Sequence, residues 1–445
     1  MDKILIQGRF INADEEFKGQ IEIDKKTGLI SRVGEELGKP DFKFRNSQLI
    51  FPGMGDIHIH AREDETGKQN HKEEYSTAAQ AAINGGVVHV IAMPNTPSPL
   101  TTLKQLEWHK KRTKKLPITV LNYVGIGPGT KPLKQKVPYK VYTGPSVGQL
   151  FFRNENELRE SLKNYKDQLV SFHVEDFEVL EANKDKPTHT ERRPVECVEV
   201  ALEYVLDIIE KYNLKAKLCH WSTGKKSFEM IKKHRKKGFD TKIEVSPLHL
   251  YFDEDMLKEK PELWPYVQMN PALQSKEHRF ELIKGLKEGF IDYLATDHAP
   301  HTLDEKFKNF GSERVYLELK KEHLPECQRI ACMDSVSGTP QLDTYSLICA
   351  WLMTEYHFKA KDIARVASFN PGQFVNQFLG KEFGKGFGRI EKGYQGSLTV
   401  IDLGVGTTVN RENLKTKVKW SPFEGITFSG SLKMLMIKGQ VCYKI

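Results

Sequence analysis

Between residues 53 and 384, short apolar runs alternate with longer stretches of helical spacing. The runs are rich in β-branched and aromatic residues and predict strands, whereas the stretches between them predict helices. Strands and helices that alternate in this way are typical of an α/β fold with a parallel, TIM-like (β/α)8 barrel. The eight predicted strands are residues 55–60, 87–93, 118–125, 139–143, 169–173, 216–220, 242–246 and 291–297.

Both ends of the chain have another pattern, in which strand-like runs follow one another without helices between them. These runs are residues 4–6, 21–23, 28–33, 398–401, 433–437 and 440–443. Because the two termini of a domain usually lie close together, we expect both ends to form one small β-sandwich domain. We expect this domain to comprise residues 1–52 and 385–445, and the barrel to comprise residues 53–384.

The composition is that of a globular chain. Of the 445 residues, 39% are hydrophobic and 28% are charged, which argues against disorder. The longest apolar run, Leu347 to Met353, falls short of the ~18 residues that a membrane span needs. The six cysteines are scattered without a C-x-x-C pair, which favours reduced thiols. We therefore expect a cytoplasmic protein with no membrane partner and no disulfide scaffold.

Basic residues exceed acidic ones by 67 to 59, which gives a formal net charge of +8. Two basic runs, residues 109–115 and 232–237, fall late in segments of helical spacing, where cations complement the helix dipole. Such runs can also mark a nucleic-acid surface, but no aromatic residues interleave with them and no nucleic-acid motif accompanies them. We expect solvated helix ends and no nucleic-acid partner. Salt-sensitive retention on DNA would identify the alternative.

Residues of the types that bind metal ions fall on five of the predicted strands or at their ends. Two histidines in the first strand, His58 and His60, share one face because side chains alternate along a strand. The C-terminal strand ends of such a barrel form its active-site mouth, so polar residues there converge. The set is His58, His60, Lys140, His173, His220 and Asp297.

This set predicts two divalent metal ions in each chain. The ligands of strands one and eight would hold one ion, and the histidines of strands five and six would hold the other. Imidazole and carboxylate suit zinc best. Two ions about 4 Å apart need a bridging anion. We expect Lys140 of strand four, carbamylated by CO₂, to supply it, because an ammonium beside two dications is electrostatically disfavoured. A lysine that reaches to solvent is the alternative.

Ordered motifs extend over nearly the whole chain. They are DIHIHAR at 56–62, MPNT at 93–96, KVYTGPS at 140–146, HVED at 173–176, HWST at 220–223, Asn-Pro at 270–271, DHAPHT at 297–302, and the segments 393–402 and 422–425. With these motifs the chain resembles the amidohydrolase superfamily, and within it the dihydroorotases. The resemblance implies a metal-dependent cyclic amide hydrolase that interconverts N-carbamoyl-L-aspartate and L-dihydroorotate in de novo pyrimidine biosynthesis.

The resemblance also implies roles for particular residues. Arg62, Asn95 and His301 would grip the substrate, and Asn270 would add a contact. Asp297 would be the catalytic proton shuttle, taking a proton from the attacking water and passing it to the amide nitrogen. The residue chemistry agrees, because a guanidinium offers a two-pronged hydrogen-bond fork to the substrate carboxylate.

Each substrate-binding role has a structural alternative. Arg62 can form an ion pair with Glu63 or Glu73. His301 can serve in loop packing, and Asn95 can bond locally within its turn.

Some segments depart from the family pattern. The usual Pro-Gly after Arg62-Glu63 is replaced by Asp-Glu-Thr at 64–66, and a few extra residues precede Lys72. The usual Asn-Pro-Pro-Leu-Arg reads Asn-Pro-Ala-Leu-Gln at 270–274. The nearest rival function is a sister cyclic amidase, allantoinase or hydantoinase, and a non-catalytic scaffold of the same fold is a third reading. The sequence leaves a homo-oligomer open.

Overall fold

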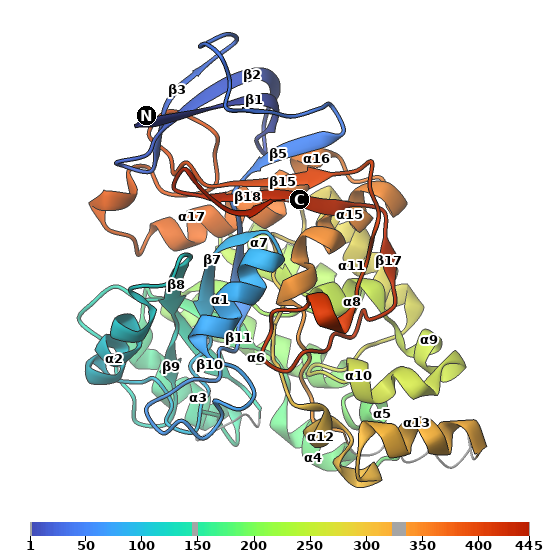
Figure 1. Ribbon diagram of the computed structural model, residues 1–445. Helices are drawn as coiled ribbons and strands as arrows, with labels where there is room; N and C mark the ends of the chain where they lie inside the picture. Colours follow the sequence, from blue (N-terminus) through green and yellow to red (C-terminus); the bar gives the residue numbers. More distant parts are fainter. Residues whose placement is uncertain (1, 145–149, 323–334, 445) are drawn as a thin grey trace.

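The computed structural model describes residues 2–144, 150–322 and 335–444, which form a barrel under a β-rich layer (Figure 1). The last two residues of the KVYTGPS motif, Pro145 and Ser146, lie outside the described residues, as do two cysteines, Cys327 and Cys332.

All eight predicted strands occur in the barrel within the described part of the chain. The third is interrupted at Tyr123, whose backbone nitrogen donates to Ala92 O at 2.9 Å, and so it forms two short pieces, β8 and β9. Neighbouring strands pair in parallel, and Ile59 pairs with His298 to join the last strand to the first. The barrel strands are β6 (Met54–Ile59), β7 (Val87–Ala92), β8 (Thr119–Asn122), β9 (Val124–Ile126), β10 (Tyr139–Tyr142), β11 (Leu169–His173), β12 (Lys215–Leu218), β13 (Thr241–Val245) and β14 (Tyr293–Leu294).

Helices follow the strands and surround the barrel (Figure 1). In α6, apolar residues between Val198 and Ile209 recur at helical spacing and are buried, which is the pattern of a helix packed on one face. The longer helices are α1 (Tyr75–Asn84), α2 (Leu103–Thr113), α3 (Glu155–Leu162), α6 (Val195–Tyr212), α7 (Lys226–Lys236), α11 (Lys276–Glu288), α13 (Glu313–Glu322) and α15 (Tyr345–Glu355). Shorter ones are α4 (Phe177–Asn183), α5 (His189–Arg192), α8 (Pro247–Tyr251), α9 (Glu254–Glu259), α10 (Trp264–Val267), α12 (Leu303–Lys306), α16 (Ala360–Ile363) and α17 (Asn370–Asn376).

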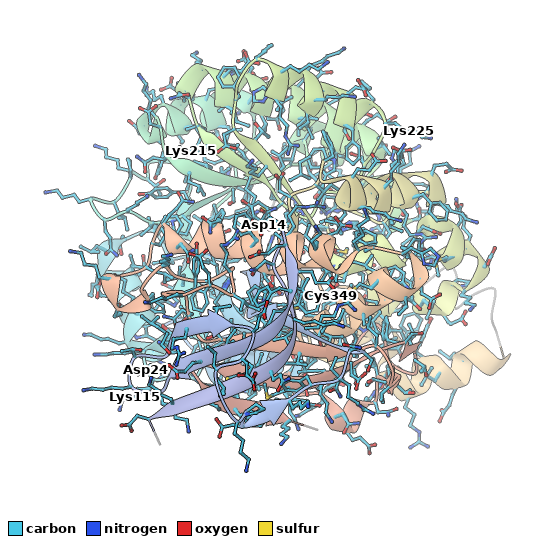
Figure 2. The ribbon with its side chains drawn as sticks, turned by 90° about the horizontal axis from the view of Figure 1, so that it is seen from above. Asp14, Asp24, Lys115, Lys215, Lys225 and Cys349 are labelled. Carbon is cyan, nitrogen blue, oxygen red and sulfur yellow. The ribbon has the colours of Figure 1, made fainter. Side chains whose placement is uncertain are left out.

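The basic runs lie at helix ends, as predicted. Each contributes the cations of a last turn, in α2 and in α7. Figure 2 places Lys115, just after α2, and Lys225, just before α7, on opposite sides of the molecule. Among the described helices, none is long and apolar enough to cross a membrane.

The chain ends form one hydrogen-bonded sheet with a core of its own. Strand β5 lies between β1, its parallel neighbour from the N-terminal segment, and β15, its antiparallel neighbour from the C-terminal segment. Buried side chains from both segments, such as Ile6, Ile23, Val400 and Met434, pack in one cluster. The strands are β1 (Lys3–Ile11), β2 (Glu16–Asp24), β3 (Leu29–Gly34), β4 (Phe42–Lys43), β5 (Gln48–Pro52), β15 (Leu398–Asp402), β18 (Ser431–Ile437) and β19 (Gln440–Lys444).

A C-terminal excursion leaves this sheet and returns to the loops of the barrel. It includes the small pair β16 (Thr407–Thr408) and β17 (Thr427–Phe428). Within it, Thr416 Oγ1 donates to Glu73 at 2.6 Å and Trp420 Nε1 donates to His301 O at 2.7 Å. The excursion thus contacts loops that carry predicted site residues. The domain boundaries at 52/53 and 384/385 stay a prediction.

Candidate active site

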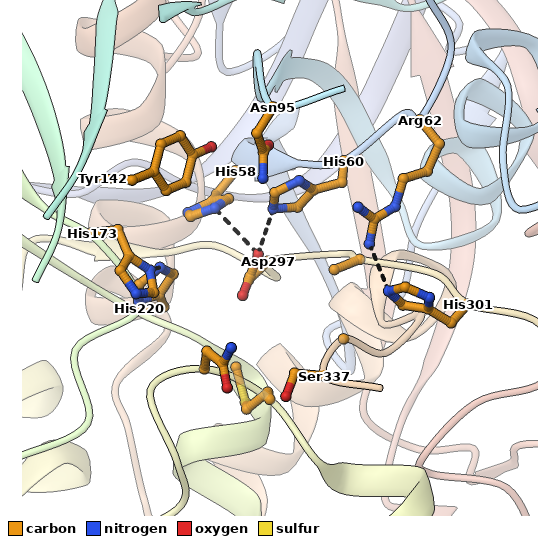
Figure 3. Close-up of a pocket in the computed structure, with 14 residues that line it drawn as sticks. His58, His60, Arg62, Asn95, Tyr142, His173, His220, Asp297, His301 and Ser337 are labelled. Atoms are coloured by element: carbon orange, nitrogen blue, oxygen red, sulfur yellow. Dashed lines mark hydrogen bonds and ion pairs between the residues drawn. The ribbon is translucent and has the colours of Figure 1, made fainter. Parts of the chain in front are cut away.

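A cavity of about 140 Å³ lies at the C-terminal ends of the barrel strands, where active sites of this fold occur (Figure 3). Nine of the ten residues predicted from the sequence line it, and the tenth, Lys140, is buried in β10. The sequence did not indicate the other lining residues. The lining consists of His58, His60, Arg62, Asn95, Tyr142, His173, His220, Met269, Asn270, Asp297, Ala299, His301, Ser337 and Gly338.

Asp297 brings together the two histidines of the first strand. Its Oδ1 lies 3.2 Å from His58 Nε2 and 3.0 Å from His60 Nε2 (Figure 3). Burial opposes ionisation of this carboxyl group, but the two imidazoles hold the pKa of Asp297 well below its usual value. The three side chains therefore present an anionic oxygen and two ring nitrogens to one point.

His173 and His220 form a second group of donors. His173 Nδ1 faces His220 Nε2 at 2.9 Å, a separation at which two ring nitrogens need a proton or another cation between them. Burial lowers the pKa of both imidazoles. Neutral imidazole is the form that binds metal ions.

The two donor groups adjoin each other. His58, His220 and Asp297 each offer one ligand atom, and these atoms lie within 4.8 Å of one another. Imidazole nitrogens with one carboxylate oxygen are a donor set that suits zinc and similar ions. The residues present therefore fit a metal centre.

Lys140 lies near His173 and His220 and does not reach solvent. Its side chain is fully buried, and within the described structure its Nζ makes no hydrogen bond to a nitrogen or oxygen atom. Nζ is 4.8 Å from the centre of the Tyr142 ring. Burial lowers the pKa of Lys140, opposed by the neighbouring Cys219 thiol. The structure contradicts the alternative of a lysine that extends to water.

Two buried glutamates, which the sequence analysis missed, contact the ring nitrogens of His58 and His173. Glu244 Oε1 lies 2.6 Å from His58 Nδ1, and its other oxygen pairs with the ammonium of Lys217. His58, Cys219 and Glu244 also cluster as potential ligands, but Lys217 already neutralises the carboxylate. Both strands carry a further charged residue, since β12 reads Lys-Ala-Lys-Leu and β13 reads Thr-Lys-Ile-Glu-Val, so the residue pattern did not single out this pair.

The second glutamate supports His173. Glu175 Oε2 lies 2.7 Å from His173 Nε2 and 2.5 Å from Arg193 Nη1. A carboxylate that accepts the outer N–H of an imidazole fixes the tautomer in which the inner nitrogen has a free lone pair. Glu175 and Glu244 thus leave the lone pairs of His173 Nδ1 and His58 Nε2 directed toward the cavity, where they can bind a metal ion.

A cationic side chain forms one wall of the cavity. Arg62 is 5% exposed, and burial lowers its pKa to about 10, so it stays charged at neutral pH. Its Nη2 lies 3.3 Å from His301 Nε2. The carboxylates of Glu63 and Glu73 bind Arg112 and His298 instead, so the alternative of an Arg62 ion pair with either is wrong for the described structure.

Three of the lining residues have a strained backbone. Arg62, His220 and Asp297 adopt positive φ angles of 59°, 32° and 50°. For residues other than glycine this region costs on the order of 1–2 kcal/mol and persists where the surrounding structure holds it, commonly at functional sites. All three side chains thereby reach the cavity from loops that directly follow strands.

Comparison with known proteins decides the family. Residues 49–442 match the model of the amidohydrolase family. The chain belongs to the amidohydrolase family. Members of this family are typically metal-dependent, which agrees with the potential metal ligands around Asp297.

Several curated relatives of this amidohydrolase are named dihydroorotase. A protein named dihydroorotase from Pyrococcus furiosus is 27% identical over 99% of this chain and 92% of its own length. One from Thermococcus kodakarensis is 28% identical over 99% and 94%, and one from Bacillus subtilis is 29% identical over 89% and 87%.

Solved structures confirm the fold of this amidohydrolase. L-hydantoinase from Arthrobacter aurescens superposes with a TM-score of 0.84 at 19% identity, covering 100% of this chain and 96% of the other. D-hydantoinase from Thermus sp. superposes with a TM-score of 0.78 at 18% identity, covering 99% and 95%. The prediction of a TIM-like barrel with an additional β domain is confirmed.

Proposed function

We propose that this amidohydrolase is a dihydroorotase, which interconverts N-carbamoyl-L-aspartate and L-dihydroorotate in pyrimidine biosynthesis. The observation that carries the proposal is the cavity itself. Metal-ligand groups occupy one side, and the buried guanidinium of Arg62 occupies the other. A substrate with a reacting amide and a carboxylate away from it meets both requirements, and relatives with this name along 99% of the chain support it.

We propose two divalent ions, most readily zinc, as the cofactor. His58, His60 and Asp297 would hold one ion, and His173 with His220 the other. Lys140 would bridge them as a carbamate. Its buried amine makes no hydrogen bond to nitrogen or oxygen, and burying a polar group without a partner is costly. As a carbamate, the side chain would carry a carboxylate whose partners would be the two cations. When bound, the ions supply an activated water and polarise the carbonyl of the ring amide.

The chain's own residues perform the remaining steps. Arg62, with Asn95, Asn270 and His301, would hold the substrate so that its amide carbonyl lies beside the metal ligands. Asp297 would accept the proton of the attacking water at its carboxylate and deliver it to the departing amide nitrogen. In the reverse direction it would remove the proton from the carbamoyl nitrogen as the ring closes.

The test compares dihydroorotate, allantoin and hydantoin as substrates of purified, zinc-loaded protein in a spectrophotometric assay. We expect turnover of dihydroorotate and ring closure of carbamoyl aspartate, the latter favoured at acidic pH because cyclisation consumes a carboxylate charge and a proton. Turnover of allantoin or hydantoin without dihydroorotate would replace the proposal by a sister cyclic amidase. The cytoplasmic location and the homo-oligomer stay predictions.

A further inference from the structure

The segment 64–72 belongs to the loop of Arg62 and contacts two of the three other loops that carry predicted substrate-binding residues, those of Asn95 and His301. It begins two residues after Arg62, in the stretch where the sequence departs from the family pattern. We propose that Asp64 and Lys72 are positioning residues that fix Asn95 and His301 relative to Arg62 and so set the affinity for the substrate carboxylate. This inference rests on the proposed function for its kinetic part.

Asp64 fastens the segment to the loop of Asn95. The side chain is 2% exposed, and its Oδ2 accepts a hydrogen bond from Ser98 N at 2.7 Å. Its Oδ1 accepts from Thr66 N at 2.9 Å and from Thr66 Oγ1 at 2.6 Å. One buried carboxylate thus ties both loops, and hydrogen bonds from backbone N–H groups to a charged acceptor are strong and directional.

Glu65 adds a second tie between the same loops. Its carboxylate accepts from Ser98 Oγ at 2.8 Å. Within the described residues, Asp64 and Glu65 therefore both accept hydrogen bonds from Ser98, in the loop of Asn95.

Lys72, at the other end of the segment, holds His301. Its Nζ lies 2.9 Å from Glu305 Oε1 and 3.2 Å from His301 Nδ1. Glu305 Oε2 in turn lies 3.1 Å from His301 Nδ1. The carboxylate accepts from both neighbours when the histidine carries its proton on Nδ1. In this tautomer the ammonium of Lys72 donates to Glu305 and not to Nδ1, so Lys72 holds His301 through the carboxylate.

This tautomer determines what His301 offers to the cavity. With the proton on Nδ1, the lone pair of Nε2 accepts from Arg62 Nη2, 3.3 Å away. Burial and the cations Arg62 and Lys72 lower the pKa of His301 to about 3, so the ring is neutral. Lys72 and Glu305 therefore act on the substrate through His301, whose Nε2 orients Nη2 of the Arg62 guanidinium (Figure 3).

The experiment uses full-length, metal-loaded protein with two variants and two matched controls. Asp64→Asn keeps the size of the side chain but removes its charge, and Lys72→Met keeps the length but removes the ammonium. The controls are Asp24→Asn, whose carboxylate likewise accepts from two backbone amides in a turn of the β domain, and Lys68→Met, an exposed lysine of the same segment. Figure 2 shows Asp24 on the β layer.

The first readout is kinetic. We expect each variant to raise KM for carbamoyl aspartate by about tenfold while kcat changes little and the metal content stays that of the wild type. The controls should match the wild type. Unchanged KM in both variants, or loss of bound metal together with kcat, would overturn the inference.

The second readout does not depend on the reaction. Hydrogen–deuterium exchange of the peptide 94–100 should speed up in Asp64→Asn, because the Ser98 amide loses its charged acceptor, and should not change in Asp24→Asn. Equal exchange rates of this peptide in wild type and Asp64→Asn would refute the proposed role of Asp64 in holding the loop of Asn95. If wild-type protein converts neither substrate, the proposed function fails, and the exchange result still decides whether Asp64 holds the loop.

Discussion

His58 Nδ1 lies 2.6 Å from Oε1 of Glu244, a carboxylate that is fully buried beneath the cavity and neutralised by Lys217. The contact orients the ring of His58 and leaves Nε2 directed at Asp297. The geometry of the proposed metal centre therefore depends on a strand, β13, that contributes no ligand of its own.

Removing the charge of Glu244 should weaken metal binding. Loss of such a carboxylate typically costs 10- to 100-fold in affinity, and we expect Glu244→Gln to raise the metal dissociation constant by about this factor. Competition with a chromophoric chelator measures it. Glu22→Gln, which removes a carboxylate paired with Lys3 in the β sheet, is the control. Equal affinities for all three proteins would contradict the role of Glu244.

The ligand assignment predicts that metal content and activity fall together. We expect close to two divalent ions per chain in the wild type, and fewer in His58→Ala with a rate lower by orders of magnitude, since each ligand fixes both geometry and affinity. Asp297→Asn should collapse kcat because the proton shuttle is lost. Elemental analysis and steady-state kinetics check both. One ion per chain with full activity would refute the two-metal proposal.

If Lys140 is a carbamate, its role is that of a carboxylate. Lys140→Ala should lose metal and activity, and millimolar propionate should restore part of both because it places a carboxylate in the vacated space. Propylamine of similar size should restore neither. Rescue by the amine, or electron density for an unmodified Lys140 amine in an active, fully metallated crystal, would refute the carbamate.

Arg62 should act mainly on substrate affinity. Arg62→Met removes a charged hydrogen-bond pair and should cost ~2–4 kcal/mol, mostly as a higher KM, with metal content unchanged. Arg45→Met, at an arginine of the β layer whose side chain is 78% exposed, is the control. An Arg62 variant with the wild-type KM and kcat would place the carboxylate elsewhere.

A histidine outside the cavity predicts a pH dependence of folding. His89 in β7 is fully buried with no hydrogen-bond partner in the described structure for either ring nitrogen, and burial lowers its pKa to about 3. The unfolded chain, with a histidine pKa near 6.5, binds a proton that the folded chain does not. His89 alone should therefore lower the free energy of unfolding by about 2 kcal/mol between pH 7 and pH 5.

Urea unfolding of wild type and His89→Leu at these two pH values tests this contribution. The variant should lose less stability on acidification than the wild type, by about the same 2 kcal/mol. Equal losses in the two proteins would show that His89 is not the source.

The sequence predicted the barrel and the metal-ligand side of the cavity because both depend on local pattern, whereas the substrate-binding residues came from the family resemblance. His58 and His60 share a face through strand alternation, and the strand ends converge in any parallel barrel. The buried residues that orient His58, Glu244 and its partner Lys217, were not predictable in this way. Glu244 meets His58 across the barrel, since the two come from β13 and β6, and Lys217 pairs with it from β12, so these contacts depend on strand register and barrel closure.

The break at Tyr123 also had no signal in the apolar pattern. The run 118–125 predicts one strand, but its two pieces pair with different neighbours, β8 with β7 and β9 with β10. Between them the phenol of Tyr123 donates to Ile57 O at 3.1 Å. Such a contact with β6 is set by three-dimensional packing rather than by the spacing of residues 118–125.

The position of β5 between β1 and β15 has a consequence for synthesis of the chain. β5 leaves the ribosome early, but its antiparallel neighbour follows only after the entire barrel sequence. Until then one edge of the first sheet segment is open, and open strand edges promote association between chains. Closing this sheet is a contact of very long sequence separation, which slows folding. β15 therefore closes this edge late in synthesis, and a chain that stops before β15 would leave β5 exposed.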